Sequence, residues 1–120
     1  MSAKKKNVYV VYYSMYGHVA TMAREICKGL EKAGVNPKLY QIAETLPAEV
    51  LEKMHAPPKQ ADVPTITPAD LAQCDGVLFG IPTRFGMVPA QIKAFFDQCG
   101  QLWMTGGLYE IIISYFLFNN

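Results

Sequence analysis

The sequence lacks a charge excess of either sign and any long apolar run. Its 11 basic and 10 acidic residues leave a net charge of +1, which gives no support for a nucleic-acid or acidic-polymer partner. No apolar run approaches the roughly 18 to 20 residues that a membrane-spanning helix needs. The apolar segment at 8–13 is too short for a secretory signal peptide. We therefore expect a soluble, cytoplasmic protein.

The sequence also lacks several motifs that mark known types of catalytic or signalling site. The cysteines, Cys27, Cys74 and Cys99, lie far apart and form no C-x-x-C pair, which favours reduced, buried thiols over a nucleophile. No arginine stands six residues after a cysteine, so a phosphatase of the C-x5-R type is excluded. The first apolar run ends in "VVYYS", without the acidic residues of a phosphate-sensing receiver domain. There is no Ser/His/Asp set and no cluster of metal ligands.

The first third of the chain predicts a βαβ unit. A length of 120 residues, 51% of them hydrophobic, suits one domain with a single sizeable core. The run "VYVVYY" at 8–13 is typical of a strand buried on both faces. Apolar residues then recur three and four apart over 18–33, which predicts a helix that ends at Gly34. "KLYQI" at 38–42 predicts the next strand, joined by a right-handed crossover.

The same alternation continues to the end of the chain. "PAEVLEKM" at 47–54 predicts two helical turns, followed by an exposed, proline-stiffened loop. Thr67 is placed to cap a short helix. "GVLFGIP" at 76–82 predicts a buried strand, a helix begins near Pro89, and "IIISYFLF" at 111–118 predicts a last strand. The fold class is therefore α/β, a parallel sheet with helices on both faces.

Ligands of such sheets bind beyond the carboxyl ends of the strands, so two loops are candidate sites. The first, Ser14 to His18, leads into a helix N-terminus, where N–H groups and the helix dipole favour an anion. Gly17 permits a tight turn, and the side chains of Ser14, Tyr16, His18 and Thr21 add donors. A phosphate monoester fits this set, although the pattern is neither a P-loop nor a dinucleotide fingerprint. An N-terminal cap without a ligand is the alternative.

The second loop is "PTRFGM", at 82–87. Arg84 can neutralise negative charge on a bound ring, and Phe85 can stack on it. The alternative is a surface turn with one solvated arginine. Trp103 is expected in the core, since single tryptophans usually are, and His55 is expected in a solvated loop.

Together, "YYSMYGHVATMA", "ETLP", "FGIPTRFGM" and "AFFDQCGQLW" resemble the WrbA family of flavodoxin-like NAD(P)H:quinone oxidoreductases. The resemblance runs from about Lys6 to Tyr109. It implies a doubly wound sheet of strand order 2-1-3-4-5, with FMN at the switch between strands 1 and 3. It also implies a homo-oligomer, a tetramer in the family. Peripheral attachment at the plasma membrane is implied for some relatives.

The implied reaction is a two-electron reduction of quinones to hydroquinones by NADH or NADPH. The flavin carries the chemistry, and no side chain is expected to be catalytic. Tyr16 would also lie near the nicotinamide, and Trp103 would wall the site that quinone and nicotinamide share. The residues implied to surround the cofactor are Ser14, Met15, Tyr16, Gly17, His18 and Val19 at the phosphate and ribityl chain, and Thr83, Arg84 and Phe85 at the isoalloxazine ring.

The resemblance ends at Tyr109, and Glu110 is the first departure from the family pattern. We expect 1–120 to be a single flavodoxin-like domain of about four strands that lacks the family's last strand and helices. Residues 110–120 form a divergent apolar tail. Two interpretations stay open: an FMN-dependent quinone reductase, or a non-catalytic truncated isoform that associates with full-length subunits through its exposed strand.

Overall fold

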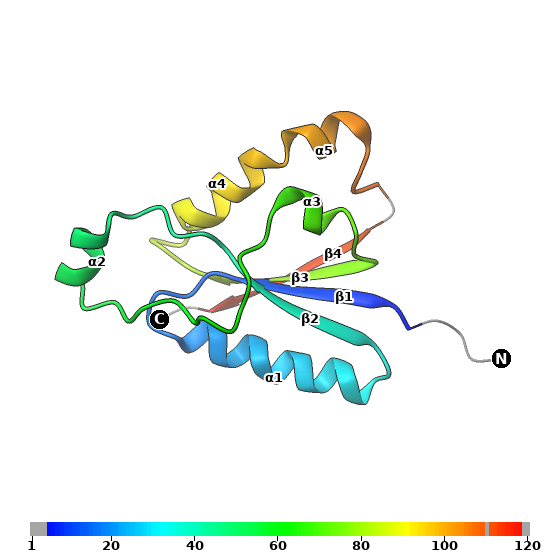
Figure 1. The fold of residues 1–120 in the computed structure, drawn as a ribbon, viewed down its shortest axis with the longest axis horizontal. Coiled ribbons are helices and arrows are strands. Elements are labelled where there is room, and N and C mark those ends of the chain that lie inside the picture. The colour runs from blue at the N-terminus through cyan, green and yellow to red at the C-terminus, as the bar shows by residue number, and fades with distance from the viewer. Residues whose placement is uncertain (1–4, 110, 119–120) are drawn as a thin grey trace.

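Four parallel strands form the central sheet of the computed structural model, which describes residues 5–109 and 111–118. They lie in the order β2-β1-β3-β4 (Figure 1). Their bounds are Asn7–Tyr12 for β1, Asn36–Gln41 for β2, Gly76–Pro82 for β3 and Ile112–Phe118 for β4. The expected parallel α/β sheet is confirmed, and its order matches the first four positions of the flavodoxin-like arrangement.

Helices cover both faces of this sheet, because each strand directs alternate side chains to opposite sides. Tyr9 and Val11 of β1 join the core beneath α4, whereas Val10 and Tyr12 join the core beneath α1. In Figure 1, α1 lies on one side of the strands and α3, α4 and α5 lie on the other. The helices are α1 (His18–Lys32), α2 (Ala48–Lys53), α3 (Pro68–Leu71), α4 (Ala90–Gln98) and α5 (Gly100–Thr105).

Two helices show how the sequence sets their limits. α1 buries Val19, Ala20 and Ala23 and ends before Gly34, whose φ of 83° is the left-handed conformation that stops a helix. α3 begins with the expected cap. The Thr67 hydroxyl accepts from the N–H of Asp70 at 3.2 Å, and the Asp70 carboxylate accepts from the N–H of Thr67 at 3.1 Å.

The segment between β2 and β3 is mostly irregular, as predicted. α2 buries none of its residues and projects away from the sheet in Figure 1. His55 follows it in an exposed position with a φ of 56°, so its expected place in a solvated loop is confirmed. None of the helices in the described part of the chain has the length and apolar character that a bilayer crossing requires.

Two expectations about burial are wrong, and one helix was not predicted. Trp103 lies on α5 with 85% of its surface exposed, because this six-residue helix buries none of its residues in the core. The sequence did not predict α5, which is short, begins at Gly100 and is followed by Gly106. All the cysteines are free, but only Cys74 is buried, since Cys27 and Cys99 lie at the margins of the two cores.

The predicted last strand is present as β4, which pairs with β3 along its whole length. Glu110, Asn119 and Asn120 of the expected divergent tail lie outside the described residues. Phe116 packs against the core beneath α1. Ile112, Ile113, Tyr115 and Leu117 are exposed. Among the described residues, no strand pairs with the other edge of β4.

Candidate functional site

The two candidate loops meet because the strands that precede them are paired. Tyr12 of β1 lies opposite Gly80 of β3, and the N–H of Tyr13 donates to the carbonyl of Gly80 at 3.2 Å. The two segments that follow these strands then leave the sheet at the same edge. A small hollow lies between them, lined by Ser14, Met15, Tyr16, His18, Val19, Pro82 and Arg84.

The first loop presents backbone donors at the start of α1; residues 14–18 are called the phosphate loop below. Gly17 is the N-cap of α1, with a φ of 97° and no side chain to occupy the first-turn N–H groups. The N–H groups of Val19 and Ala20 have no intrahelical acceptor, as in any first helical turn. A Cβ on Gly17 would meet no atom within 4 Å, so the space in front of this turn is open.

Two hydroxyls of this region have defined partners. The N–H of Gly17 donates to Ser14 Oγ at 3.0 Å, and a hydroxyl that accepts one bond can still donate its own proton. Thr21 Oγ1 donates to the carbonyl of Gly17 at 3.0 Å. This bond directs Thr21 along its own helix, so the structure does not support its predicted part in the loop.

The second loop is a tight hairpin. Arg84 and Met87 exchange two backbone hydrogen bonds of 2.9 Å, and Phe85 and Gly86 between them have φ values of 54° and 78°. Two left-handed residues in a two-residue loop make a turn of type I′. A phenylalanine in this conformation costs about 1–2 kcal/mol, and its ring is fully exposed. Strained residues cluster at binding sites and switch regions, which makes this hairpin a candidate for ligand contact.

Arg84 is positioned to act on the phosphate loop. It lines the hollow, is half-buried, and its Nη1 donates to the carbonyl of Thr83 at 3.1 Å. Its charge also acts to lower the pKa of the Tyr13 hydroxyl, although burial and then the Glu44 hydrogen bond raise that pKa overall. Arg84 is therefore half-buried on an exposed hairpin, and its role in binding stays a prediction.

A largely buried carboxylate that sequence reasoning missed, Glu44, lies behind the phosphate loop. Glu44 Oε2 accepts from the Tyr13 hydroxyl at 2.7 Å, and Oε1 accepts from Gln91 Nε2 at 2.7 Å. The N–H groups of Thr45 and Leu46 also donate to Oε1, at 2.9 and 3.1 Å. Burial alone would raise the pKa of Glu44, but the bonds from Tyr13 and Gln91 lower it to about 2.

Lys59 connects this carboxylate to the phosphate loop. Its Nζ lies 3.4 Å from Glu44 Oε2 and donates to the carbonyl of Ser14 at 3.0 Å. The ammonium also lies 4.3 Å from the centroid of the Tyr13 ring. A glutamate and a lysine fifteen positions apart, with a short helix and an irregular loop between them, give no periodic pattern that could have revealed the pair.

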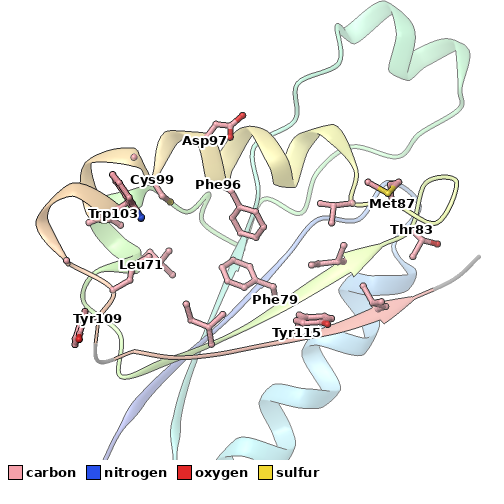
Figure 2. A pocket seen from close by; sticks show the side chains of 18 of the residues that line it. Leu71, Phe79, Thr83, Met87, Phe96, Asp97, Cys99, Trp103, Tyr109 and Tyr115 are labelled. Carbon is pink, nitrogen blue, oxygen red and sulfur yellow. The ribbon is translucent and has the colours of Figure 1, made fainter.

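Trp103 lies apart from these loops. It lines an open apolar trough of about 1240 Å³ between α4–α5 and β3–β4. Thr83 and Met87 lie at one end of this trough and Trp103 at the other, with Phe79 and Phe96 between them (Figure 2). The phosphate loop does not contribute to its lining. Thr83 thus connects the hairpin to the trough, while Trp103 and Tyr16 do not share a hollow.

The parallel sheet, with two loops that meet where β1 and β3 end, defines a flavodoxin-like α/β protein. Residues 14–109 match the family described as NADPH-dependent FMN reductase. The chain belongs to this family. The match begins at Ser14 and includes both loops described above.

Named relatives agree with this assignment. The chain is 60% identical over 102 residues to quinone-oxidoreductase QR2 of Triphysaria versicolor, covering 84% of this chain and 49% of that protein. It is 52% identical over 101 residues to NAD(P)H quinone oxidoreductase PST1 of Candida albicans, covering 84% and 50%. The chain spans about half the length of the curated relatives it matches.

Among solved structures, the fold is similar to that of a WrbA-like flavodoxin from Agrobacterium tumefaciens. The TM-score is 0.68 with 25% identity, over 96% of this chain and 60% of that one. The resemblance to WrbA-type flavodoxin-like reductases is confirmed by these similarities. The roles assigned to individual residues of the two loops and to Trp103 stay predictions.

Proposed function

We propose that this chain binds FMN between the phosphate loop and the hairpin at 83–87 and takes part in the reduction of quinones by NADH or NADPH. The observation that carries the proposal is the meeting of the two loops at the carboxyl ends of β1 and β3, in a chain of the FMN reductase family. The names of the relatives, which are quinone oxidoreductases, support the quinone as substrate.

The residues present fit the phosphate end of FMN. First-turn N–H groups, the Ser14 hydroxyl and the Arg84 guanidinium are all donors, and the turn at Gly17 leaves open space before them. Such a set suits a phosphate monoester, because several neutral donors and one cation share its negative charge. Backbone groups of Met15 to Val19 would hold the phosphate and the ribityl chain.

The hairpin fits an aromatic ring system. Thr83 offers a hydroxyl, Arg84 a positive charge and Phe85 an exposed ring on a rigid turn. When bound, FMN supplies reversible hydride transfer between a nicotinamide and a quinone. The chain's own part is to orient the ring through the hairpin backbone and to place the Arg84 charge where negative charge on the ring is stabilised. The apolar trough beside Thr83 and Met87 offers an apolar surface for a quinone.

The exposed face of the Tyr16 ring is available to contact the nicotinamide. Its hydroxyl donates to the carbonyl of Met54 at 3.1 Å, which fixes the ring at the rim of the hollow with 47% of its surface exposed. A ring held in this way can contact a planar ligand without losing further freedom. We retain Trp103 as a second substrate contact, at the far end of the trough.

Flavin binding tests the proposal directly. The purified chain is titrated with FMN while flavin fluorescence and the visible absorption bands are followed, and NADH oxidation is then measured with and without a quinone. We expect retained flavin and quinone-dependent oxidation. Absence of bound flavin at micromolar concentrations would defeat the enzyme interpretation for this chain.

One observation favours a second candidate function, association with further subunits. β4 has exposed side chains at Ile112, Ile113 and Tyr115, and in the described part of the chain its outer edge is unpaired. An apolar edge strand of this kind pairs readily with another chain. We propose that the chain forms an oligomer through β4 with copies of itself or with longer members of its family. Light scattering of the wild type and of Ile113→Lys tests this, with a smaller mass expected for the variant.

A further inference from the structure

The segment from Glu44 to Asp62 is held beside α1 and the phosphate loop by contacts near its middle and near its end. Near its middle, the Met54 carbonyl accepts the Tyr16 hydroxyl at 3.1 Å. Near its end, Asp62 forms a 3.1 Å ion pair with Arg24 of α1. Arg24 also donates to the Gln60 side chain. Lys59, between these contacts, is therefore held in place against Ser14.

The groups that contact Lys59 show which negative charge its ammonium balances. Glu44 is largely buried, with 12% of its side chain exposed, and four neutral donors keep its carboxylate ionised. Among the described residues, Lys59 is the one cation paired with it. The same ammonium donates to the main-chain carbonyl of Ser14, the first residue of the phosphate loop. An ionised carboxylate this close to an anion site opposes binding unless a cation balances it.

We infer that Lys59 is a positioning residue which neutralises Glu44 behind the phosphate loop and thereby sets the preference of the site for a phosphorylated flavin over an unphosphorylated one. This inference rests on the proposed function. The contact with the Ser14 carbonyl holds the loop in register, and the ion pair removes the negative potential that Glu44 would otherwise project onto a bound phosphate. Riboflavin, which has no phosphate, does not sense that potential.

The experiment compares affinities for FMN and riboflavin, measured by quenching of flavin fluorescence. In Lys59→Met the affinity for FMN should fall on the order of tenfold, because one unit of charge is lost near a dianion, while the affinity for riboflavin changes little. The loss should shrink at high salt, which screens the uncovered charge of Glu44. Lys59→Arg should keep the preference. Lys28→Met is the control, since Lys28 forms an exposed ion pair with Glu25 on α1.

A double variant distinguishes two effects of Lys59: neutralising the Glu44 charge and holding the Ser14 carbonyl in place. Glu44→Gln combined with Lys59→Met removes both charges, so the ratio of FMN to riboflavin affinity should return to within about threefold of the wild-type ratio. Equal losses for both flavins in Lys59→Met, or a double variant whose ratio stays tenfold low, would overturn the inference. Should the single variant not fold, the ratio in a folded double variant decides. A wild-type chain that binds neither flavin would instead overturn the proposed function, and the inference with it.

Discussion

The Tyr13 hydroxyl and Glu44 Oε2 are joined by a 2.7 Å hydrogen bond across 31 positions of sequence. Tyr13 is the first residue beyond β1, and Glu44 follows β2. The bond therefore ties the ends of two neighbouring strands together directly beneath the phosphate loop. It also places an ionised carboxylate beside the anion site that we propose.

The charge state of Glu44 predicts an acid limit to stability. Its pKa is lowered from its ordinary value to about 2 in the folded chain, so its stabilising effect is present above the ordinary carboxyl pKa and is lost as pH falls toward 2. We expect the wild type to lose about 2 kcal/mol more than Glu44→Gln between pH 5 and pH 2. Urea unfolding at several pH values measures this. Parallel losses in both proteins would contradict it.

Gly17 should be needed for its backbone conformation rather than for its small size. Gly17→Ala is expected to cost about 1–2 kcal/mol, because a φ of 97° is unfavourable for any L side chain although the space is open. Flavin affinity should fall with it. Gly29→Ala, inside the same helix and equally open, is the matched control and should stabilise by up to about 1 kcal/mol. Thermal unfolding reads both effects, and a neutral Gly17→Ala would contradict the assignment.

Gly80 is predicted to be essential for packing. A Cβ there would lie 2.9 Å from Val19 Cγ1 and 2.6 Å from Phe116 Cζ. The Phe116 ring tip can move, but Val19 is buried and branched, so Gly80→Ala should destabilise by about 1–3 kcal/mol. Gly76→Ala, whose Cβ would lie 3.4 Å from the Ile112 carbonyl oxygen, should cost less. If Gly80→Ala and Gly76→Ala lowered the urea midpoint equally, the close contact at Gly80 would not be the cause of the destabilisation.

Replacing Phe85 should raise the stability of the fold but weaken flavin binding. Phe85→Asn relieves a left-handed phenylalanine, since asparagine tolerates that conformation, so we expect the free energy of unfolding to rise by up to about 1 kcal/mol. The same change removes an exposed ring from the hairpin and should weaken the binding of both FMN and riboflavin. A variant that is less stable, or that binds flavin as well as wild type, would contradict the role proposed for this ring.

Sequence reasoning succeeded where a single physical signal dominates. The continuous apolar runs at 8–13 and 76–82 are typical of central parallel strands, and both are present close to the expected bounds. Because parallel strands end at one edge, the meeting of the phosphate loop and the hairpin followed from the same alternation. The cap at Thr67 was equally predictable, since its two hydrogen bonds are local.

The rest depends on contacts that no local pattern encodes. The pairing of Glu44 with Lys59 exists only because an irregular segment returns to the phosphate loop. The exposure of Trp103 depends on how α5 follows α4, and α5 itself is too short for periodicity to reveal. The strained turn at Phe85 was also beyond prediction, because phenylalanine rarely takes that conformation.

Gly80 carries only a hydrogen atom where other residues carry a side chain. This allows two separate parts of the molecule to pack closely against each other at Gly80. Val19 stands in the first turn of α1, and Phe116 belongs to β4, the strand at the open edge of the described sheet. A partner strand that restrained Phe116 would therefore also restrain the turn at which we propose that a phosphate binds. By reciprocity of linkage, occupation of either location should slow amide hydrogen exchange at the other.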